Sequence, residues 1–174
     1  MAKLPILVAP DPRLKQTAAP IGKVDDALRR LMDDMLETMY VAPGIGLAAP
    51  QVGVSKRLIV VDIAKEDEPK APICMVNPEL VWISDEDATY EEGCLSVPEH
   101  YAEVVRPARV RVRFVDRDNV VRELDADGLL ATVVQHEMDH LDGILFIDHL
   151  TSLKRNMILR KLTKARKSAT GSAL

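Results

Sequence analysis

The segment HEMDH, residues 136–140, places two histidines four residues apart, with a glutamate directly after the first. On an α-helix such histidines project from the same face one turn apart, where their imidazoles can hold one metal ion. A carboxylate beside the first ligand is positioned to take a proton from water held by that metal. The spacing therefore predicts metal ligands at His136 and His140 and a catalytic acid–base at Glu137.

A third ligand is needed, because catalytic metal sites usually combine three protein ligands with an open position. Downstream donors are scarce: His149 lies nine residues after His140, and no acidic residue follows Asp148. Cys94 is the remaining soft donor in a constrained setting, and a thiolate with two imidazoles suits iron(II) or zinc. We therefore predict Cys94 as the third ligand. The other cysteine, Cys74, is expected to be a small buried hydrophobic residue.

The elements that must position these residues can be predicted from the spacing of apolar side chains. The expected elements are an amphipathic helix over 25–42, a strand over 57–63, one or two strands over 73–84, a hairpin over 108–124, a largely buried helix over 128–143 and a final helix over 152–167. Segment 44–53 is rich in small and turn-forming residues and is expected to be a loop. Together these elements predict an α+β fold, with mostly antiparallel strands around a buried metal-binding helix and a helix at the C-terminus.

Length and composition are those of an ordinary soluble globular protein, with 174 residues, 47% hydrophobic and 29% charged. We expect one catalytic domain over residues 1–174, long enough to bury a core without disulfides. No apolar run approaches the roughly 20 residues of a membrane span, and the N-terminus lacks the features of a secretory signal. The expected location is the cytoplasm, or an organelle entered without a retained presequence.

Basic residues are concentrated at the C-terminus. Residues 150–174 hold seven Lys and Arg and no acid, which leaves −11 for the rest of a chain whose net charge is −4. This asymmetry suggests an anionic partner for the helix over 152–167. The same helix carries an apolar stripe that predicts packing against the body, formed by Leu153, Met157, Ile158 and Leu162.

Three stretches carry a family resemblance: GIGLAAPQ at 44–51, EGCLS at 92–96 and QHEMDH at 135–140. They resemble the three signature motifs of the peptide deformylases, and nearly the whole chain is similar to bacterial type 1 members of the Gram-negative branch. The resemblance implies hydrolysis of the N-formyl group from the initiator methionine of nascent polypeptides, with release of formate. It also implies one divalent metal ion on the predicted cysteine and histidine ligands, natively Fe2+, which Zn2+ or Ni2+ can replace.

The resemblance further assigns roles to residues around the metal. Gln51 and the backbone N–H of Leu95 would donate hydrogen bonds to the charged oxygen of the tetrahedral transition state. Glu92 and Arg106 would pair and brace the Cys94 loop, with two separate solvated charges as the alternative. Substrate contacts are implied for two glycines that let an extended peptide approach and for three apolar residues around the methionine side chain: Gly44, Gly46, Ile45, Leu129 and Val133. Some enterobacterial members have an arginine at the position of Tyr101, so contacts made by that arginine do not carry over.

Two other functions stay open from the residues alone. A zinc peptidase of the HExxH kind would cleave ordinary peptide bonds, but this chain offers it no obvious third ligand. In a non-catalytic module that binds metal or RNA, Glu137 would have no function. The terminal basic helix resembles the one with which similar deformylases dock on the ribosome. The expected partners are therefore nascent formylated peptides and, through this helix, ribosomal RNA, with no membrane.

Overall fold

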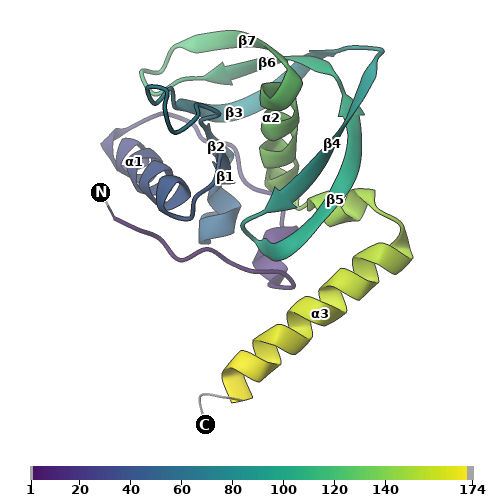
Figure 1. Cartoon of the computed structure of the whole chain (residues 1–174). Helices are drawn as coiled ribbons and strands as arrows, with labels where there is room; N and C mark the ends of the chain where they lie inside the picture. The colour runs from purple at the N-terminus through teal and green to yellow at the C-terminus, as the bar shows by residue number, and fades with distance from the viewer. Residues whose placement is uncertain (1, 172–174) are drawn as a thin grey trace.

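The computed structural model describes residues 2–171 (Figure 1). Its helices, where η marks a 3-10 helix, are η1 (Pro12–Lys15), α1 (Asp26–Val41), η2 (Ala49–Val52), α2 (Gly128–Leu141), η3 (Phe146–His149) and α3 (Ser152–Gly171). Its strands are β1 (Gly46–Ala48), β2 (Leu58–Val61), β3 (Ile73–Ile83), β4 (Asp87–Cys94), β5 (Val97–Pro107), β6 (Arg109–Val115) and β7 (Val121–Asp127). Five strands form one sheet in the order β1-β2-β3-β6-β7, and β4 pairs with β5 separately. Every pairing between these strands is antiparallel, which confirms the predicted α+β class.

Helix α1 covers one face of the five-stranded sheet. It begins after Asp25, whose side chain accepts a hydrogen bond from the N–H of Leu28 as a helix N-cap. Its apolar residues recur every three or four positions, and two of them, Met35 and Met39, are completely buried in the core cluster that includes β2. Burial of each such side chain contributes about 1.5–3 kcal/mol. The predicted helix over 25–42 is confirmed to within one residue at each end.

Helix α2 lies against the other face of the sheet, between that face and the β4–β5 hairpin (Figure 1). Ala131 and Val134 share a core cluster with Val110 of β6. The helix stops where Gly143 adopts a left-handed conformation (φ +73), and a Cβ atom there would overlap the carbonyl group of Lys15. The helix is buried over most of its length, as predicted, so its polar residues must find partners in the interior.

The prediction of a loop over 44–53 is wrong, because this segment contains β1 and η2. Leu47 and Ala48 are completely buried, and Leu47 lies opposite Val60 of β2. The composition of the segment signals a turn, but pairing with β2 makes part of it a short edge strand. The sequence pattern also leaves residues 87–107 unassigned, and there β4 and β5 form a long hairpin with several exposed acidic side chains.

Helix α3 extends from η3 and runs away from the sheets (Figure 1). Its predicted apolar stripe is only partly confirmed: Leu162 is buried, whereas Leu153 and Met157 are 71% and 47% exposed. Ile158 and Leu159 join Leu162 in a cluster with the N-terminal segment, so the packing face is rotated from the predicted stripe. Within residues 2–171, no helix is both long and apolar enough to cross a membrane.

Candidate metal centre

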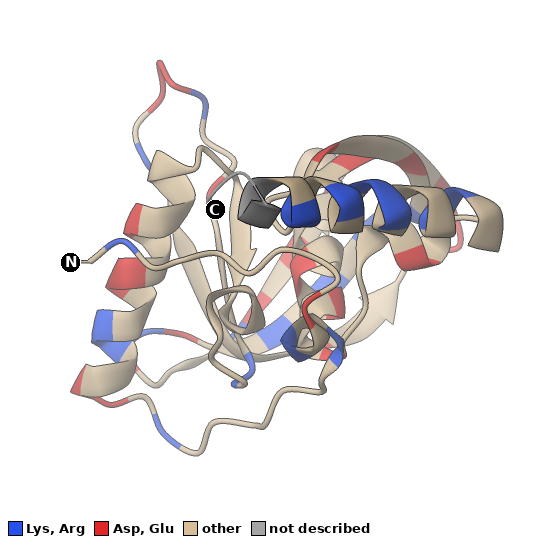
Figure 2. Ribbon diagram, turned by 90° about the horizontal axis from the view of Figure 1, so that it is seen from below, with Lys and Arg blue, Asp and Glu red and all other residues tan. Residues whose placement is uncertain are grey.

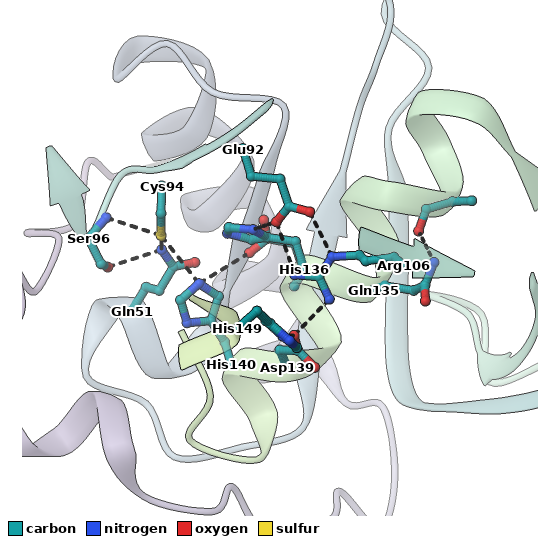
Figure 3. Close-up of polar contacts among 12 residues, drawn as sticks. Gln51, Glu92, Cys94, Ser96, Arg106, Gln135, His136, Asp139, His140 and His149 are labelled. Atoms are coloured by element: carbon teal, nitrogen blue, oxygen red, sulfur yellow. Dashed lines mark hydrogen bonds and ion pairs between the residues drawn. The ribbon is translucent and has the colours of Figure 1, made fainter. Parts of the chain in front are cut away.

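The three predicted ligands come together where the end of β4 meets α2 (Figure 3). Cys94 is the last residue of β4, and His136 and His140 project from one face of α2. One ligand atom from each residue lies within 4.8 Å of those of the other two, and Cys94 Sγ is 3.4 Å from His140 Nε2. Within the described residues this is the one such group of Cys, His and acidic side chains.

The orientation of His136 is set by a buried carboxylate. His136 Nδ1 lies 2.8 Å from Glu92 Oε1, and Arg106 donates to both oxygens of Glu92 at 2.7 and 3.0 Å. Burial alone would raise the pKa of Glu92, but the hydrogen bonds from His136 and Arg106 hold it below its ordinary value. The ionised carboxylate accepts the Nδ1 proton, which leaves Nε2 of His136 to face a metal. The predicted pairing of Glu92 with Arg106 is confirmed, and both side chains are buried rather than solvated.

The pKa values of the two imidazoles are shifted in opposite directions. Burial alone would lower the pKa of His136, but the charge of Glu137 and the hydrogen bonds with Cys94 and Glu92 raise it well above its ordinary value. Burial and the nearby His136 hold the pKa of His140 well below its ordinary value, so His140 is neutral at pH 7. A metal at this site would therefore displace a proton from His136, as is usual for imidazole ligands.

Glu137 lies beside this group with an unused acceptor. Its carboxylate is buried, Oε1 has no hydrogen-bond partner within residues 2–171, and that oxygen is 4.0 Å from His140 Nε2. Burial raises the pKa of Glu137 to about 7. A buried carboxylate oxygen without a partner is costly unless something else binds there. One thiol and two imidazoles therefore fit a divalent metal ion, and the free oxygen of Glu137 would be available to accept a proton beside it.

Gln51 lies on the other side of the sulfur. Its Nε2 donates to Ser96 Oγ at 3.0 Å and lies 3.4 Å from Cys94 Sγ, while its Oε1 accepts from the N–H of Ala48 at 2.9 Å. The N–H of Ser96 also points at Cys94 Sγ at 3.4 Å. Both donors direct positive hydrogens at the sulfur and hold it in place at the end of β4. Ser96 is missed by the analysis of the sequence, although it closes the EGCLS motif.

A cavity of about 700 Å³ opens beside the metal centre, and Gln51, Cys94, His136 and Glu137 contribute to its lining. The six predicted residues with roles toward the substrate also line it: Gly44, Ile45, Gly46, Leu95, Leu129 and Val133. Tyr90 and Thr132 line the same cavity and are not predicted. Tyr90 lies on a strand that the sequence does not reveal, whereas Thr132 could have been found from its position one helical turn before His136.

The glycines of this region make room for neighbouring side chains. A Cβ at Gly46 would lie 2.5 Å from Glu137 Oε2, so the glycine lets the carboxylate pack directly against the backbone. A Cβ at Gly93 would lie 2.5 Å from the ring of Tyr101, which therefore lies over this glycine at the edge of the cavity. Glycine at these positions therefore has a structural reason, in addition to the predicted role of Gly46 in letting a peptide approach.

Cys74 lies apart from the metal centre, on β3. It is partly buried in the cluster beneath α1, and burial raises the pKa of its thiol to about 11. A thiol with such a pKa stays protonated near neutral pH and is a poor nucleophile or metal ligand. Its position agrees with the expected role as a small hydrophobic residue.

We predict that Glu92→Gln lowers the affinity for Zn2+ or Co2+ about 10- to 100-fold, the usual effect of losing a partner that orients a metal-binding histidine. An amide accepts hydrogen bonds less strongly than a carboxylate and leaves the charge of buried Arg106 poorly compensated. The measurement is competition for the metal with a chromogenic chelator. Glu91→Gln, a change at the exposed neighbouring glutamate, is the control. Parental metal affinity in Glu92→Gln would contradict the orienting role.

The fold and the site together define an α+β metalloprotein of the hydrolase type, with a Cys-His-His metal site next to a buried carboxylate. A family model described as polypeptide deformylase matches residues 3–156. The chain is 60% identical over 169 residues to a peptide deformylase of Phenylobacterium zucineum (strain HLK1). The matched region covers 97% of this chain and 100% of the relative. The chain belongs to the polypeptide deformylase family.

Solved structures agree with this assignment. The crystal structure of peptide deformylase from Ehrlichia chaffeensis matches with a TM-score of 0.92 and 39% identity, covering 97% of this chain and 99% of that one. A structure from the same organism in complex with actinonin matches with a TM-score of 0.91 and 41% identity over 95% and 98% of the two chains. The family consists of metal-dependent hydrolases that remove the N-formyl group from nascent peptides. Membership confirms the predicted family and enzyme class.

Proposed function

We propose that this chain carries out the reaction of its family on the N-terminal formylmethionine of nascent polypeptides and releases formate. One divalent metal ion would be held by Cys94, His136 and His140. The observation that carries the proposal is the buried Glu137 carboxylate, which has a free oxygen beside the three ligand atoms and lines the cavity. When bound, the metal supplies an electrophilic centre that acidifies water and polarises the formyl carbonyl. We propose Fe2+ as the native ion, as the resemblance to the family implies, and Zn2+ or Ni2+ could occupy the same ligands.

The chain's own side chains would handle the proton and the developing charge. Glu137, whose pKa lies near 7, can accept a proton at neutral pH and then deliver it to the leaving amine. Gln51 Nε2 and the backbone N–H of Leu95 would donate to the oxygen that becomes negative in the transition state. The amide plane of Gln51 is fixed beside the ligand sulfur, because Oε1 accepts from Ala48 N–H and Nε2 donates to Ser96 Oγ.

The substrate peptide would lie in the cavity in an extended conformation. Residues 44–46 at its edge offer backbone groups for strand addition, and Ile45, Leu129 and Val133 offer apolar surface for the methionine side chain. Actinonin binds a deformylase that matches this chain with a TM-score of 0.91, and we propose the same cavity as its binding site here. We further propose that residues 1–174 form one catalytic domain and that it works in the cytoplasm.

Formate release from formyl-Met-Ala-Ser, by protein purified without oxygen, tests the proposed reaction. We expect formate and free Met-Ala-Ser in equal amounts, with no cleavage of the peptide bonds. Cleavage of unformylated peptides instead would support the zinc peptidase alternative. A metal-loaded protein that is inert toward all formyl peptides would support the non-catalytic alternative. The described residues do not favour the peptidase alternative, because His149 is turned toward Asp139 and is no third ligand for such a site.

We predict that Leu129→Ala raises KM for formyl-Met-Ala-Ser about 5- to 10-fold with little change in kcat, since it removes apolar contact made equally in ground and transition states. Leu129 lines the cavity and is 44% exposed, so the change leaves the core intact, whereas Val133 belongs to the core cluster. Leu153→Ala on exposed α3 is the control. An unchanged KM would remove Leu129 from the methionine pocket.

We also propose that α3 docks on ribosomal RNA. Lysine and arginine occur along the helix with no acid between them (Figure 2), and Arg160, Lys164 and Lys167 line one shallow groove on it. We predict that Arg160→Glu with Lys164→Glu weakens co-sedimentation with ribosomes at least 10-fold in low salt, because two cationic contacts to phosphate become repulsive. Lys56→Glu with Lys65→Glu, two exposed lysines on the body, is the control. Equal binding of both double variants would contradict docking through α3.

A further inference from the structure

The hydrogen bonds that orient His136 continue beyond Glu92 to the surface (Figure 3). Arg106 uses Nε and Nη2 for Glu92 and donates from Nη1 to Asp139 Oδ2 at 2.8 Å. The same oxygen of Asp139 lies 2.8 Å from Nε2 of His149. A connected chain of five side chains thus runs from a metal ligand inside the molecule to a half-exposed histidine on η3.

The guanidinium of Arg106 is held from two directions. Its side chain is 6% exposed and lies between the carboxylates of Glu92, at 4%, and Asp139, at 22%. A planar guanidinium with donors fixed on both edges cannot turn without breaking a charge-assisted hydrogen bond. Asp139 therefore determines the plane in which Arg106 meets Glu92, and through Glu92 it affects the angle at which His136 faces the metal.

Element η3 contacts α2 at two points with matching spacing. Phe146 stacks on His136, with ring centroids 6.0 Å apart, and His149 meets Asp139, so residues three apart on η3 contact residues three apart on α2. In a 3-10 helix, residues i and i+3 lie on the same side. The short helix thus supports both the imidazole of His136 and the carboxylate of Asp139, which holds Arg106.

We propose that Asp139 and His149 are positioning residues for the metal ligand His136. His149 would hold Asp139, Asp139 would hold Arg106, and Arg106 would hold Glu92 against the imidazole. This inference rests on the proposed metal site and adds a determinant of metal retention from η3, outside the three signature motifs. If the contact of Asp139 with His149 were only a structural ion pair, its loss would lower stability without a selective effect on metal binding.

The test is the release of Co2+ from the cobalt-loaded protein to excess chelator, together with the absorption band from thiolate to cobalt. Asp139→Asn keeps the size of the side chain and removes its charge. We expect about 10-fold faster release and a shifted band, in the range found for partners of metal-binding histidines. Asp142→Asn is the matched control, because Asp142 is also an acid at the end of α2 but pairs with Arg57 instead. Release within twofold of the parent is expected for this control.

A second pair of variants tests His149. His149→Phe keeps a ring but has no N–H donor, whereas His149→Gln places an N–H close to the position of imidazole Nε2. We expect release several-fold faster than the parent in His149→Phe and near the parent in His149→Gln. The side chain is 37% exposed, so both variants should fold, and the melting temperature of the metal-free proteins checks this.

The outcomes separate this inference from the proposed function. Suppose that the parent protein binds one Co2+ with a thiolate band and that Asp139→Asn releases it no faster than Asp142→Asn. This result would overturn the positioning role and leave the metal site standing. Equal release from His149→Phe and His149→Gln would overturn the part assigned to His149. A parent that binds no Co2+ would overturn the metal site and this inference together.

Discussion

Replacing Glu137 with alanine is expected to lower kcat for formate release about 10²- to 10⁴-fold while the protein keeps its metal. Near 10³-fold, the loss corresponds to about 4 kcal/mol of transition-state stabilisation. The reason is geometric: Oε1 of Glu137 is buried, unpaired within residues 2–171 and 4.0 Å from His140 Nε2, where it can reach water bound at the site. The two neighbouring imidazoles are not expected to take over the proton, since they are the proposed metal ligands.

The measurement pairs kcat for formyl-Met-Ala-Ser with metal content by elemental analysis. Glu137→Gln is the companion variant, because it preserves the close packing on Gly46 and removes only the proton acceptor. Asp142→Asn is the control and should keep parental activity, because Asp142 is an exposed acid that follows the last residue of α2. A loss of metal in proportion to the loss of activity would show that Glu137 holds the site together rather than transferring a proton.

Replacing Cys94 with alanine is expected to abolish stoichiometric metal binding and, with it, activity above background. A site left with two imidazoles has too few ligands to retain a divalent ion against a chelator. We expect the affinity for Co2+ or Zn2+ to fall more than about 100-fold, beyond the effect of losing an orienting partner such as Glu92. The fold should survive, because alanine fills most of the space of a half-buried thiol at the end of β4.

Metal content after dialysis and the melting temperature of the metal-free proteins measure the two effects separately. Cys74→Ala is the matched control, because Cys74 is also a half-buried cysteine but lies on β3, away from the imidazoles. It should keep parental metal and activity. If Cys94→Ala retained one tightly bound metal ion, Cys94 would be no ligand and the third donor would have to be sought elsewhere.

Much of this protein follows from short stretches of sequence. The spacing of His136 and His140, with Glu137 between them, requires only that one segment be helical, and the apolar residues around them show that the helix is buried. The hairpin over 108–124 is predicted because a clear alternation of apolar and charged residues flanks a turn. These features depend on neighbours in the chain, whose geometry repeats every 2.0 or about 3.6 residues.

What only the tertiary structure decides are the contacts between distant segments. Cys94 meets His140 across 46 positions of sequence, and Arg106 contacts Asp139 across 33 positions. No local periodicity reports these pairings, because they depend on where β4, β5 and η3 end relative to α2. The edge strand β1 and the packing face of α3 escape prediction for the same reason. Pairing with β2 and contact with the N-terminal segment, rather than local propensity, determine them.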